Sequence, residues 1–417
     1  MLKQIEGSHA MAEAIALCRP EVICAYPITP QTHIVEGLGD LVRDGHLRGC
    51  EFINVESEFA ALSVAIGASA AGARAYTATS SQGLLFMAEA VYNASGLGLP
   101  IVMTLGNRAI GAPINIWNDH SDAMALRDAG WIQLFAETNQ EAVDLHIQAF
   151  RLAEILSCPV MVCVDGFILT HAFERVDLPT QEQVDEVLPP FVPRQVLDPS
   201  DPVSIGAMVG PEAFTEVRYL SHARLQQALS RLPVLAARQD AVFGRSLDPL
   251  VRTYRTDDAE LVVVAMGSVL GTLKDVVDEL REEGHRVGVV GITCFRPFPA
   301  AAVREALGGA RRVVVVEKHL STGVAGVLAT DLLLAMGDRS VPLHTVVAGL
   351  GGRPVRTAAI ATLLRQAVAG DLAEVTVADL QHDLVDAELE RSAAQRRSGP
   401  SAENVLRDLG YVAQHGR

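Results

Sequence analysis

Short apolar runs alternate with longer helical patterns over the first 180 residues of the chain. The candidate strands, at 22–26, 52–55, 73–78, 101–105 and 160–164, are separated by spans long enough for crossover helices. Continuous apolar strands of this kind are typical of a parallel sheet that helices cover on both faces. We therefore predict an α/β domain over residues 1–180.

A second α/β pattern follows a connector of different composition. Residues 181–257 are proline-rich and aperiodic, with one helix expected near 223–232, and a connector of this length is expected to pack across the domains. Beyond it we predict a second α/β domain over 258–382 and a charged surface tail over 383–417. The elements expected there are strands at 261–265, 286–292, 312–316 and 346–348, a helix that ends near 283, and a short helix near 402–409.

The composition is that of a soluble globular protein, with 417 residues, 49% of them hydrophobic and 20% charged. The net charge of −16 argues against binding to a nucleic-acid backbone, which requires clustered Lys and Arg. The uncharged stretches at 59–73 and 90–107 are interpreted as buried core, because the first is too short for a membrane span and the second contains Asn93 and Pro100. No signal-peptide pattern opens the chain, so we expect a cytoplasmic protein.

Neither the cysteines nor the glycine-rich stretches form a cofactor motif. The six cysteines include no C-x-x-C pair and no Cys/His zinc spacing, so we predict no iron–sulfur cluster and no metal ligand in this chain. They are interpreted as small, buried and reduced side chains. The glycines at 323–326 and 349–353 fit no phosphate-binding motif and are predicted to lie in turns.

Three polar side chains, Thr29, Glu58 and Arg108, each follow one of the candidate strands. The carboxyl ends of parallel strands share one edge of a sheet, and ligands bind in α/β proteins at that edge. The sequence therefore predicts an active site that combines a hydroxyl, a carboxylate and a guanidinium.

Each of these residues has a structural interpretation as well as a chemical one. Thr29 is suited to cap a helix that begins at Pro30, beside N–H groups that attract anions. Glu58 begins an alanine-rich helix and could complement its dipole. Its apolar neighbours are expected to raise its pKa, so that it shares a proton with a bound base, and Glu56 is the second choice for this role. Arg108 is expected to bind a carboxylate bidentately rather than to form a surface ion pair.

A dense polar segment, Asn-Asp-His-Ser-Asp, occupies residues 118–122. These groups could ligate a metal ion, but ligands adjacent in sequence rarely reach one ion with good geometry. We predict that the segment forms a hydrogen-bond network within its loop. Asp119 and His120 remain further candidates for the active site.

At these residues the chain resembles the α subunits of pyruvate:ferredoxin oxidoreductases, within the 2-oxoacid:ferredoxin oxidoreductase family. The resemblance is strong over residues 1–180, and residues 260–354 resemble the second domain of the family. It implies a parallel-sheet domain that binds the pyrimidine of thiamin diphosphate, followed by a transketolase-C-like α/β domain. The matching motifs are Tyr26-Pro-Ile-Thr-Pro, Glu56-Ser-Glu, Ala71-Gly-Ala-Arg, Thr77-Ala-Thr-Ser-Ser-Gln-Gly-Leu-Leu, Asn107-Arg, Asn118-Asp-His-Ser-Asp and Arg127-Asp-Ala-Gly.

The resemblance also implies a reaction, the reversible oxidative decarboxylation of a 2-oxo acid to acyl-CoA with ferredoxin as electron acceptor. Pyruvate is the expected substrate. Glu58 falls on the glutamate that hydrogen-bonds the aminopyrimidine and activates the cofactor, while Thr29 and Arg108 fall on substrate-binding residues. The same motifs place three further residues in the cofactor site: Pro27, Ser81 and Gln82.

One expected motif is missing from the chain. Thiamin enzymes hold the diphosphate and Mg²⁺ with a Gly-Asp-Gly, whereas the Asp-Gly pairs here, at 44–45 and 165–166, lack the preceding glycine. The resemblance therefore implies that thiamin diphosphate is shared with a β subunit, and that Mg²⁺ and the [4Fe-4S] clusters lie in partner subunits. The expected complex contains β, γ and δ subunits and reacts with ferredoxin, pyruvate and CoA, without nucleic acid or membrane.

Other interpretations stay open. The same chemistry could act on 2-oxoisovalerate, 2-oxoglutarate or oxalate. The chain could instead belong to an enzyme that transfers acyl groups to lipoamide, or be a noncatalytic structural subunit that shapes the site of a partner.

Overall fold

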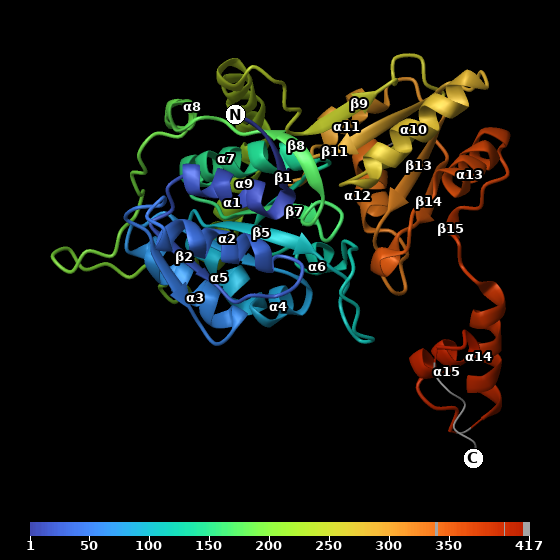
Figure 1. Cartoon of the computed structure of the whole chain (residues 1–417), viewed down its shortest axis with the longest axis horizontal. Helices are drawn as coiled ribbons and strands as arrows, with labels where there is room; N and C mark the ends of the chain where they lie inside the picture. The colour runs from blue at the N-terminus through green and yellow to red at the C-terminus, as the bar shows by residue number, and fades with distance from the viewer. Residues whose placement is uncertain (338–340, 396, 412–417) are drawn as a thin grey trace.

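The computed structural model of the chain describes residues 1–337, 341–395 and 397–411. Figure 1 shows two α/β bodies side by side and a helical arm that extends from the second body toward the C-terminus. The first body is built on a seven-stranded sheet and the second on a six-stranded sheet. The predicted α/β fold class is confirmed.

The first sheet has the strand order β12-β6-β7-β5-β4-β2-β3. Six strands are parallel, and β12 pairs antiparallel with β6 at one edge. All five strands expected from the first 180 residues lie in this sheet, whereas β6 and β12 were not expected. The strands are β2 (Val22–Ala25), β3 (Glu51–Asn54), β4 (Ala75–Thr79), β5 (Val102–Asn107), β6 (Ile132–Phe135), β7 (Val160–Asp165) and β12 (Cys294–Arg296).

Helices cover both faces of this sheet, as its continuous apolar strands require. On one face, α1, α2 and α7 share a core with the strands that includes Ile15, Leu38 and Phe150. On the other face, α3 and α5 contribute Leu62 and Val91 to a second core. The helices of this body are α1 (Gly7–Leu17), α2 (Thr32–Arg43), α3 (Glu58–Ala70), α4 (Ser81–Phe86), α5 (Ala88–Leu97), α6 (Ser121–Ala125), α7 (Asn139–Leu156), α8 (Gln181–Val187) and α9 (Phe214–Phe243).

The connector contains far more helix than expected. The helix expected near 223–232 runs as α9 over residues 214–243, because Ala228, Leu232 and Ala236 are buried against the first body, where α9 packs on α7. A separate two-stranded antiparallel ribbon joins β1 (Leu2–Glu6) to β8 (Phe173–Asp177).

The second sheet has the order β15-β14-β13-β10-β11-β9, with β9 antiparallel at one edge. Helices α10 and α13 cover one face, and α11 and α12 cover the other. The four expected strands lie within it. Its elements are β9 (Val251–Tyr254), β10 (Leu261–Ala265), α10 (Val269–Glu282), β11 (Val287–Ile292), α11 (Ala300–Leu307), β13 (Arg312–Glu317), α12 (Val327–Met336), β14 (Leu343–Val347), η1 (Leu350–Gly352), α13 (Thr357–Ala369) and β15 (Val375–Val377).

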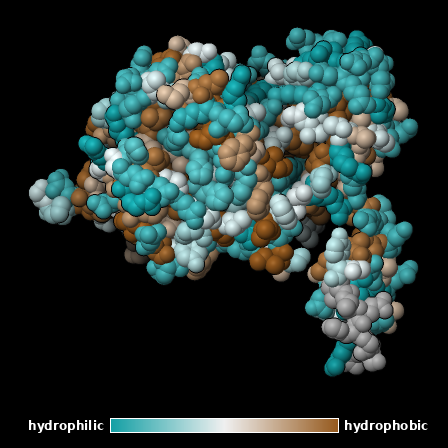
Figure 2. Space-filling model, viewed as in Figure 1, coloured by the Kyte–Doolittle hydropathy of each residue, from teal (hydrophilic) through white to brown (hydrophobic). Residues whose placement is uncertain are grey.

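One apolar core extends from the first sheet into the second body. It contains Leu62 of α3 and Trp131, and also Val264 of β10 and Leu328 of α12, all of them fully or almost fully buried. Each buried side chain of this size contributes about 1.5–3 kcal/mol. The two bodies are therefore joined by packing as well as by the chain. The outer part of the second body, around α10 and α13, is mostly hydrophilic in Figure 2.

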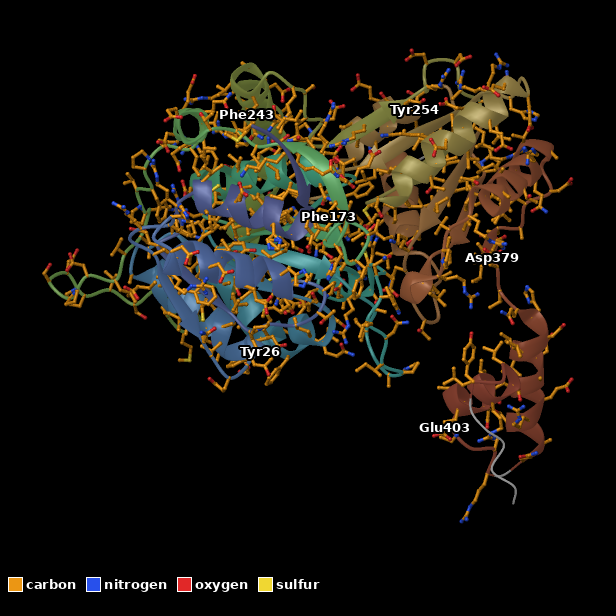
Figure 3. The ribbon with its side chains drawn as sticks, viewed as in Figure 1. Tyr26, Phe173, Phe243, Tyr254, Asp379 and Glu403 are labelled. Carbon is orange, nitrogen blue, oxygen red and sulfur yellow. The ribbon has the colours of Figure 1, made fainter. Side chains whose placement is uncertain are left out.

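The arm at the C-terminus differs from the expected tail. Two helices, α14 (His382–Ala394) and α15 (Ser401–Asp408), lie against each other, and the first of them was not expected. Polar contacts hold the pair together: Asn404 Nδ2 donates to Glu388 Oε1 at 3.1 Å, and Arg391 lies 2.7 Å from Asp408. The buried residue of α14 is Glu388, so this helix buries no apolar face whose periodicity could reveal it. Figure 3 labels Asp379, near the point where the arm leaves the second body, and Glu403 within α15.

No helix among the described residues is long and apolar enough to span a membrane.

Candidate active site

Glu58 is the first residue of α3, directly beyond β3, as the sequence predicted. Ser57 is the N-cap of this helix, and its Oγ accepts a hydrogen bond from the backbone N–H of Ala60 at 3.2 Å. The Glu58 residue is only 8% exposed, whereas Glu56 is exposed. The structure therefore favours Glu58 over Glu56 as the carboxylate that could meet a ligand out of water, and the proposed protonation of Glu58 stays a prediction.

The side chain of Glu58 lies against Gly83 in α4. A Cβ atom at Gly83 would be 2.7 Å from Glu58 Oε1 and 2.5 Å from Thr79 Oγ1, and both distances are far below a van der Waals contact. Glycine is thus the residue that lets the carboxyl group occupy this position. The contact brings Glu58 next to the carboxyl end of β4.

Arg108 and Thr29 meet at the same edge of the sheet. Arg108 follows β5 directly and is 6% exposed; its Nη1 donates to the backbone oxygen of Thr29 at 2.9 Å and its Nε to that of Asn115 at 3.0 Å. Burial lowers the pKa of Arg108 from its ordinary value, and the nearby Asp122 opposes this shift. A guanidinium has five N–H donors, and these two bonds use only two of them. Bidentate binding of a carboxylate by Arg108 stays a prediction.

The expected capping role of Thr29 is wrong. Residues 29–31 form a turn, in which the backbone N–H of Gln31 donates to the oxygen of Ile28 at 3.0 Å, and α2 begins only at Thr32. Pro30 therefore lies in this turn and not in the first turn of the helix. Thr29 and Pro27 are both exposed, at the edge where Figure 3 labels Tyr26.

Asp122 connects the strand ends, a role that was not predicted for it. Its Oδ1 accepts hydrogen bonds from Asn107 Nδ2 and the backbone of Ala123 at 2.9 and 2.8 Å, and its Oδ2 from the backbones of Ser81 and Arg108, both at 3.0 Å. Complete burial raises the pKa of Asp122 to about 6, against the lowering effect of these four donors. Within the segment 118–122, the predicted network is seen in the bond from the backbone of Ser121 to Asp119 Oδ1 at 3.0 Å. The reach of Asp122 to β4 and β5 could not be read from the sequence.

Ser81 and Gln82 lie where α4 begins, against the loop that follows β5. Ser81 is buried with a φ of +49°, in the left-handed region that non-glycine residues rarely adopt. Its Oγ is 2.5 Å from the backbone oxygen of Ala109, and Gln82 Nε2 would lie 2.5 Å from a Cβ at Gly111. Both residues therefore shape this loop.

Several buried polar atoms near the ends of β4 and β5 have no hydrogen-bond partner within the described part of the chain. Two of these side chains, Ser80 and Gln31, lie against Gly106. A Cβ at Gly106 would be 3.0 Å from Ser80 Oγ and 3.4 Å from Gln31 Cβ. Buried polar atoms almost always have partners, so unpaired ones that gather at a strand edge indicate a place for a ligand or water. The atoms are Gln31 Oε1, Thr79 Oγ1, Ser80 Oγ and Asn107 Oδ1.

Asp119 and His120 contact the second body. His120 Nε2 lies 2.8 Å from Asp165 Oδ1, and Lys318 Nζ lies 3.0 Å from Asp165 Oδ2. Burial by itself would raise the pKa of Asp165, but Lys318 and His120 outweigh burial and hold this pKa below its ordinary value. Asp119 Oδ2 accepts a hydrogen bond from the backbone of Gly351 at 3.1 Å. These contacts fix the second body against the loop after β5, and a direct role for either residue in the site stays a prediction.

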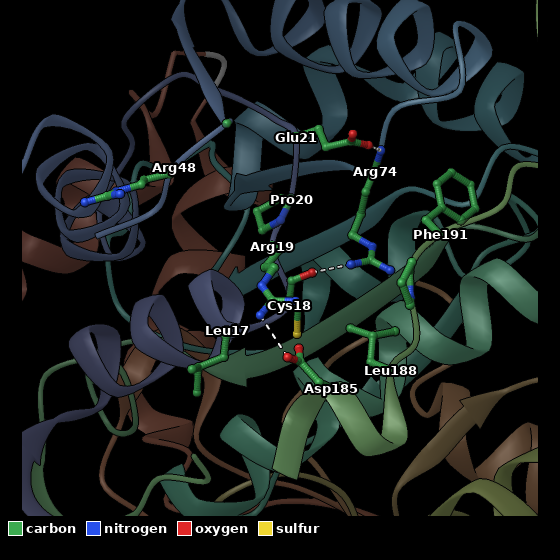
Figure 4. A pocket seen from close by; sticks show the side chains of 12 residues that line it. Leu17, Cys18, Arg19, Pro20, Glu21, Arg48, Arg74, Asp185, Leu188 and Phe191 are labelled. Atoms are coloured by element: carbon green, nitrogen blue, oxygen red, sulfur yellow. Dashed lines mark hydrogen bonds and ion pairs between the residues drawn. The ribbon is translucent and has the colours of Figure 1, made fainter. Parts of the chain in front are cut away.

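The pocket in Figure 4 lies at the opposite edge of the first sheet, at the amino ends of β2 and β4. It is lined by Arg19, Glu21 and Arg74, among others. Arg74 is already bound there, with its Nε 2.6 Å from Glu154 Oε1 and its Nη2 3.1 Å from the oxygen of Pro189. The Arg74 guanidinium is therefore already paired and does not provide a binding site for an anion. This pocket is not part of the candidate site.

Comparison with known proteins places the chain among thiamin enzymes. Residues 13–234 match the model of the pyruvate flavodoxin/ferredoxin oxidoreductase thiamine-diphosphate-binding family, and residues 259–360 match that of pyruvate:ferredoxin oxidoreductase core domain II. Pyruvate synthase subunit PorA of Methanosarcina barkeri is 47% identical over 91% of this chain and 97% of its own length. Ketoisovalerate oxidoreductase subunit VorA of Pyrococcus horikoshii is 38% identical over 84% of this chain and 90% of its own length.

The fold also has a counterpart among solved structures. A chain of the 2-oxoglutarate:ferredoxin oxidoreductase from Magnetococcus marinus matches with a TM-score of 0.68 and 19% identity, over 88% of this chain and 65% of that one. This likeness concerns the fold alone. From the matched models and the close relatives together, we conclude that the chain belongs to the pyruvate flavodoxin/ferredoxin oxidoreductase family.

Proposed function

We propose that this chain is the α subunit of a multi-subunit pyruvate:ferredoxin oxidoreductase. The complex would convert pyruvate and CoA reversibly to acetyl-CoA and CO₂ while it reduces ferredoxin. The observation that carries this proposal is the convergence of a buried carboxylate, Glu58, with the Arg108–Thr29 pair at one edge of the first sheet. The identity to relatives named as pyruvate synthase subunits supports it.

The residues at this edge fit the pyrimidine end of thiamin diphosphate. A buried carboxylate suits a ring nitrogen that must share a proton. The unpaired oxygens of Thr79, Ser80 and Asn107 offer polar partners nearby, and Gly83 leaves the space that the carboxyl group occupies. Glu58 would hold the aminopyrimidine, with Pro27, Ser81 and Gln82 around it. When bound, the cofactor supplies the nucleophilic carbon that decarboxylation of a 2-oxo acid requires.

Each protein residue would then have a defined task. Glu58 forms a hydrogen bond from its carboxyl group to the bound pyrimidine, and burial strengthens this hydrogen bond. Arg108 uses its remaining N–H donors to bind the carboxylate of the 2-oxo acid, which aligns the oxo carbon. Thr29 donates its hydroxyl to the oxo oxygen, where negative charge develops.

The diphosphate end of the cofactor calls for a second chain. We infer that a β subunit supplies the Gly-Asp-Gly motif with Mg²⁺, and that partner subunits, β and δ among them, carry the [4Fe-4S] clusters. Large apolar side chains surround the site and are exposed in this chain, as expected of a surface that a partner covers. They are Tyr26, Phe59, Phe86, Ile114 and Trp117. We also propose that the chain divides into domains at residues 1–180, 181–257, 258–382 and 383–417.

Pyruvate is the substrate that we favour. A hydroxyl and a guanidinium leave room for a short side chain, and the relatives named for pyruvate are 43–47% identical, against 38% for the one named for ketoisovalerate. 2-Oxoisovalerate is the second candidate because of that relative.

The test is viologen reduction by the complex purified on this chain under anaerobic conditions, with CoA and a panel of 2-oxo acids. Activity with pyruvate supports the proposal. Preference for another 2-oxo acid would refute pyruvate as the substrate but leave the proposed reaction type unchanged. The Glu58→Gln variant distinguishes a catalytic from a structural subunit. Assembly with loss of turnover supports the catalytic role, whereas unchanged turnover leaves only a structural one.

A further inference from the structure

Three side chains with nitrogen and oxygen donors converge beside the N-terminal ribbon. Glu6 ends β1, His33 lies in the first turn of α2, and His171 lies in the loop between β7 and β8. One ligand atom from each lies within 4.8 Å of the other two. The closest pair is His33 Nδ1 and Glu6 Oε1, which are 2.6 Å apart. These residues are far apart in the sequence, so no motif could have revealed the group.

Backbone hydrogen bonds fix two members of this group relative to each other. The N–H of Gly7 donates to the oxygen of Ala172, and the N–H of Ser8 to that of Thr170, both at 2.9 Å. A Cβ at Gly7 would lie 2.0 Å from the oxygen of Leu169, so only glycine lets the loop approach this closely. The position of His171 relative to Glu6 is therefore set by the backbone, which is the support that a metal site requires.

A second feature orients the His171 ring. Its Nδ1 lies 2.7 Å from Thr170 Oγ1, and this oxygen accepts a hydrogen bond from the backbone of Phe167 at 2.8 Å. Histidine ligands of metals usually donate the other ring N–H to an oxygen, which directs the free lone pair at the ion. In the tautomer that donates Nδ1–H to Thr170 Oγ1, the Nε2 of His171 carries the lone pair for a ligand bond.

An ion pair between Glu6 and His33 explains only part of this arrangement. The imidazole rings of His33 and His171 have centroids 4.8 Å apart, and His9 Nδ1 lies 3.9 Å from the second oxygen of Glu6. Three imidazoles thus surround one carboxylate. A metal ion bound to Glu6, His33 and His171 accounts for the convergence of these three side chains.

We propose that Glu6, His33 and His171 bind a divalent transition-metal ion, with Zn²⁺ as the best match. Two imidazoles and one carboxylate are a zinc donor set, whereas Mg²⁺ and Ca²⁺ prefer oxygen ligands alone. The fourth position is taken by water or by His9. The Glu6 side chain is 12% exposed and that of His33 is 41% exposed, so an ion can enter from solvent.

Such an ion would connect the elements behind the substrate-binding turn. His33 is close in sequence to the 29–31 turn, and a Cβ at Gly166, in the loop that leads to His171, would lie only 2.4 Å from Pro30 Cγ. The ion would thus cross-link α2 to β1 and to this loop, and its expected effect is greater stability of the chain.

The test is titration of the metal-free, full-length chain with Zn²⁺, followed by isothermal titration calorimetry. We expect one Zn²⁺ per chain, and at least a tenfold weaker Kd in each of Glu6→Gln, His33→Asn and His171→Asn. His46→Asn serves as the control, because His46 is exposed and lies outside the group. No binding to the parent chain, or equal affinity in all three variants, would overturn the proposal.

A spectroscopic readout on the parent chain does not depend on how the variants fold. Co²⁺ in a four-coordinate site gives intense visible absorption, and we expect Zn²⁺ to abolish it in the parent chain and in His46→Asn. Only the weak absorption of six-coordinate Co²⁺ in the parent chain would contradict the site. The melting temperature should rise with Zn²⁺ in the parent chain and stay constant in His171→Asn.

Discussion

Replacing Gly83 with alanine would test whether the position of the Glu58 carboxyl group controls turnover. The new Cβ would lie 2.5 Å from Thr79 Oγ1, 2.7 Å from Glu58 Oε1 and 2.9 Å from Glu58 Cγ, whereas ordinary contact begins at 3.4 Å. The backbone of α4, which contains Gly83, is held in place by the helix. The carboxyl group of Glu58 would therefore have to move away by about 0.7 Å. The change adds one methyl group and removes no functional atom.

The expected effect follows from the sensitivity of catalysis to distance. A displacement of about 1 Å in a catalytic group can cost about 100-fold in rate, so we expect kcat to fall by about 10- to 100-fold. This loss corresponds to about 1.4–2.7 kcal/mol in the activation free energy. The free energy of unfolding should change less than the activation free energy. Overpacking costs about 1–3 kcal/mol, and the better helix propensity of alanine offsets about 1 kcal/mol of this cost.

The assay is viologen reduction by the assembled complex at saturating pyruvate and CoA, with melting temperature and subunit content measured on the same samples. Gly67→Ala is the matched control, because Gly67 lies in the same helix as Glu58 and a Cβ there would meet nothing within 4 Å. The control should retain kcat. A Gly83→Ala complex that turns over within twofold of the parent would refute the role of Glu58 placement.

Three further predictions address other parts of the chain. Arg108→Lys should raise KM for pyruvate by about 10- to 100-fold with an unchanged circular dichroism spectrum, because one ammonium cannot keep the bonds to Thr29 and Asn115 and still bind a carboxylate in two places; an unchanged KM would contradict this. Asp122→Asn should destabilise the chain by about 2–3 kcal/mol in urea unfolding, because its amide N–H₂ would face backbone donors; a loss under 0.5 kcal/mol would contradict the role of Asp122 in connecting the strand ends. Burial lowers the pKa of His146 to about 4 in the folded chain. As the pH falls from 6.5 to 4, His146 is therefore protonated in the unfolded chain before it is protonated in the folded chain. The free energy of unfolding should fall by up to about 3 kcal/mol over this range. His146→Gln should remove that share of the pH dependence, which the difference between the two urea series measures; parallel series would disprove it.

Most of the first sheet could be predicted because buried parallel strands are continuous apolar runs. The exceptions have physical reasons. β6 contains Gln133, which interrupts the apolar run and whose side chain reaches back to the oxygen of Ala123 at 3.0 Å. β1 and β8 are half-exposed strands with little apolar content, and α9 gains its length from packing on α7. Contacts made after folding cannot be read from local patterns.

The candidate site was predictable as a set of residue types but not as a network. The positions of Glu58 and Arg108 after strands followed from chain order, because parallel strands end at one edge. The turn at residues 29–31, the four bonds of Asp122 and the unpaired oxygen of Gln31 depend on distances between segments. Such distances are fixed by the packing of several elements, so the sequence pattern suggests a cap at Thr29 and no separate role for Asp122.

The edge strand β12 has a consequence for how the protein must be made. Residues 294–296 pair with β6, so the first sheet gains its last strand from the chain of the second body. During synthesis β6 leaves the ribosome long before its partner, and its outer edge waits without hydrogen bonds, a state that invites pairing with other chains. A fragment that ends near residue 258 would therefore be prone to aggregate. We expect the two parts of this subunit to be encoded in a single gene.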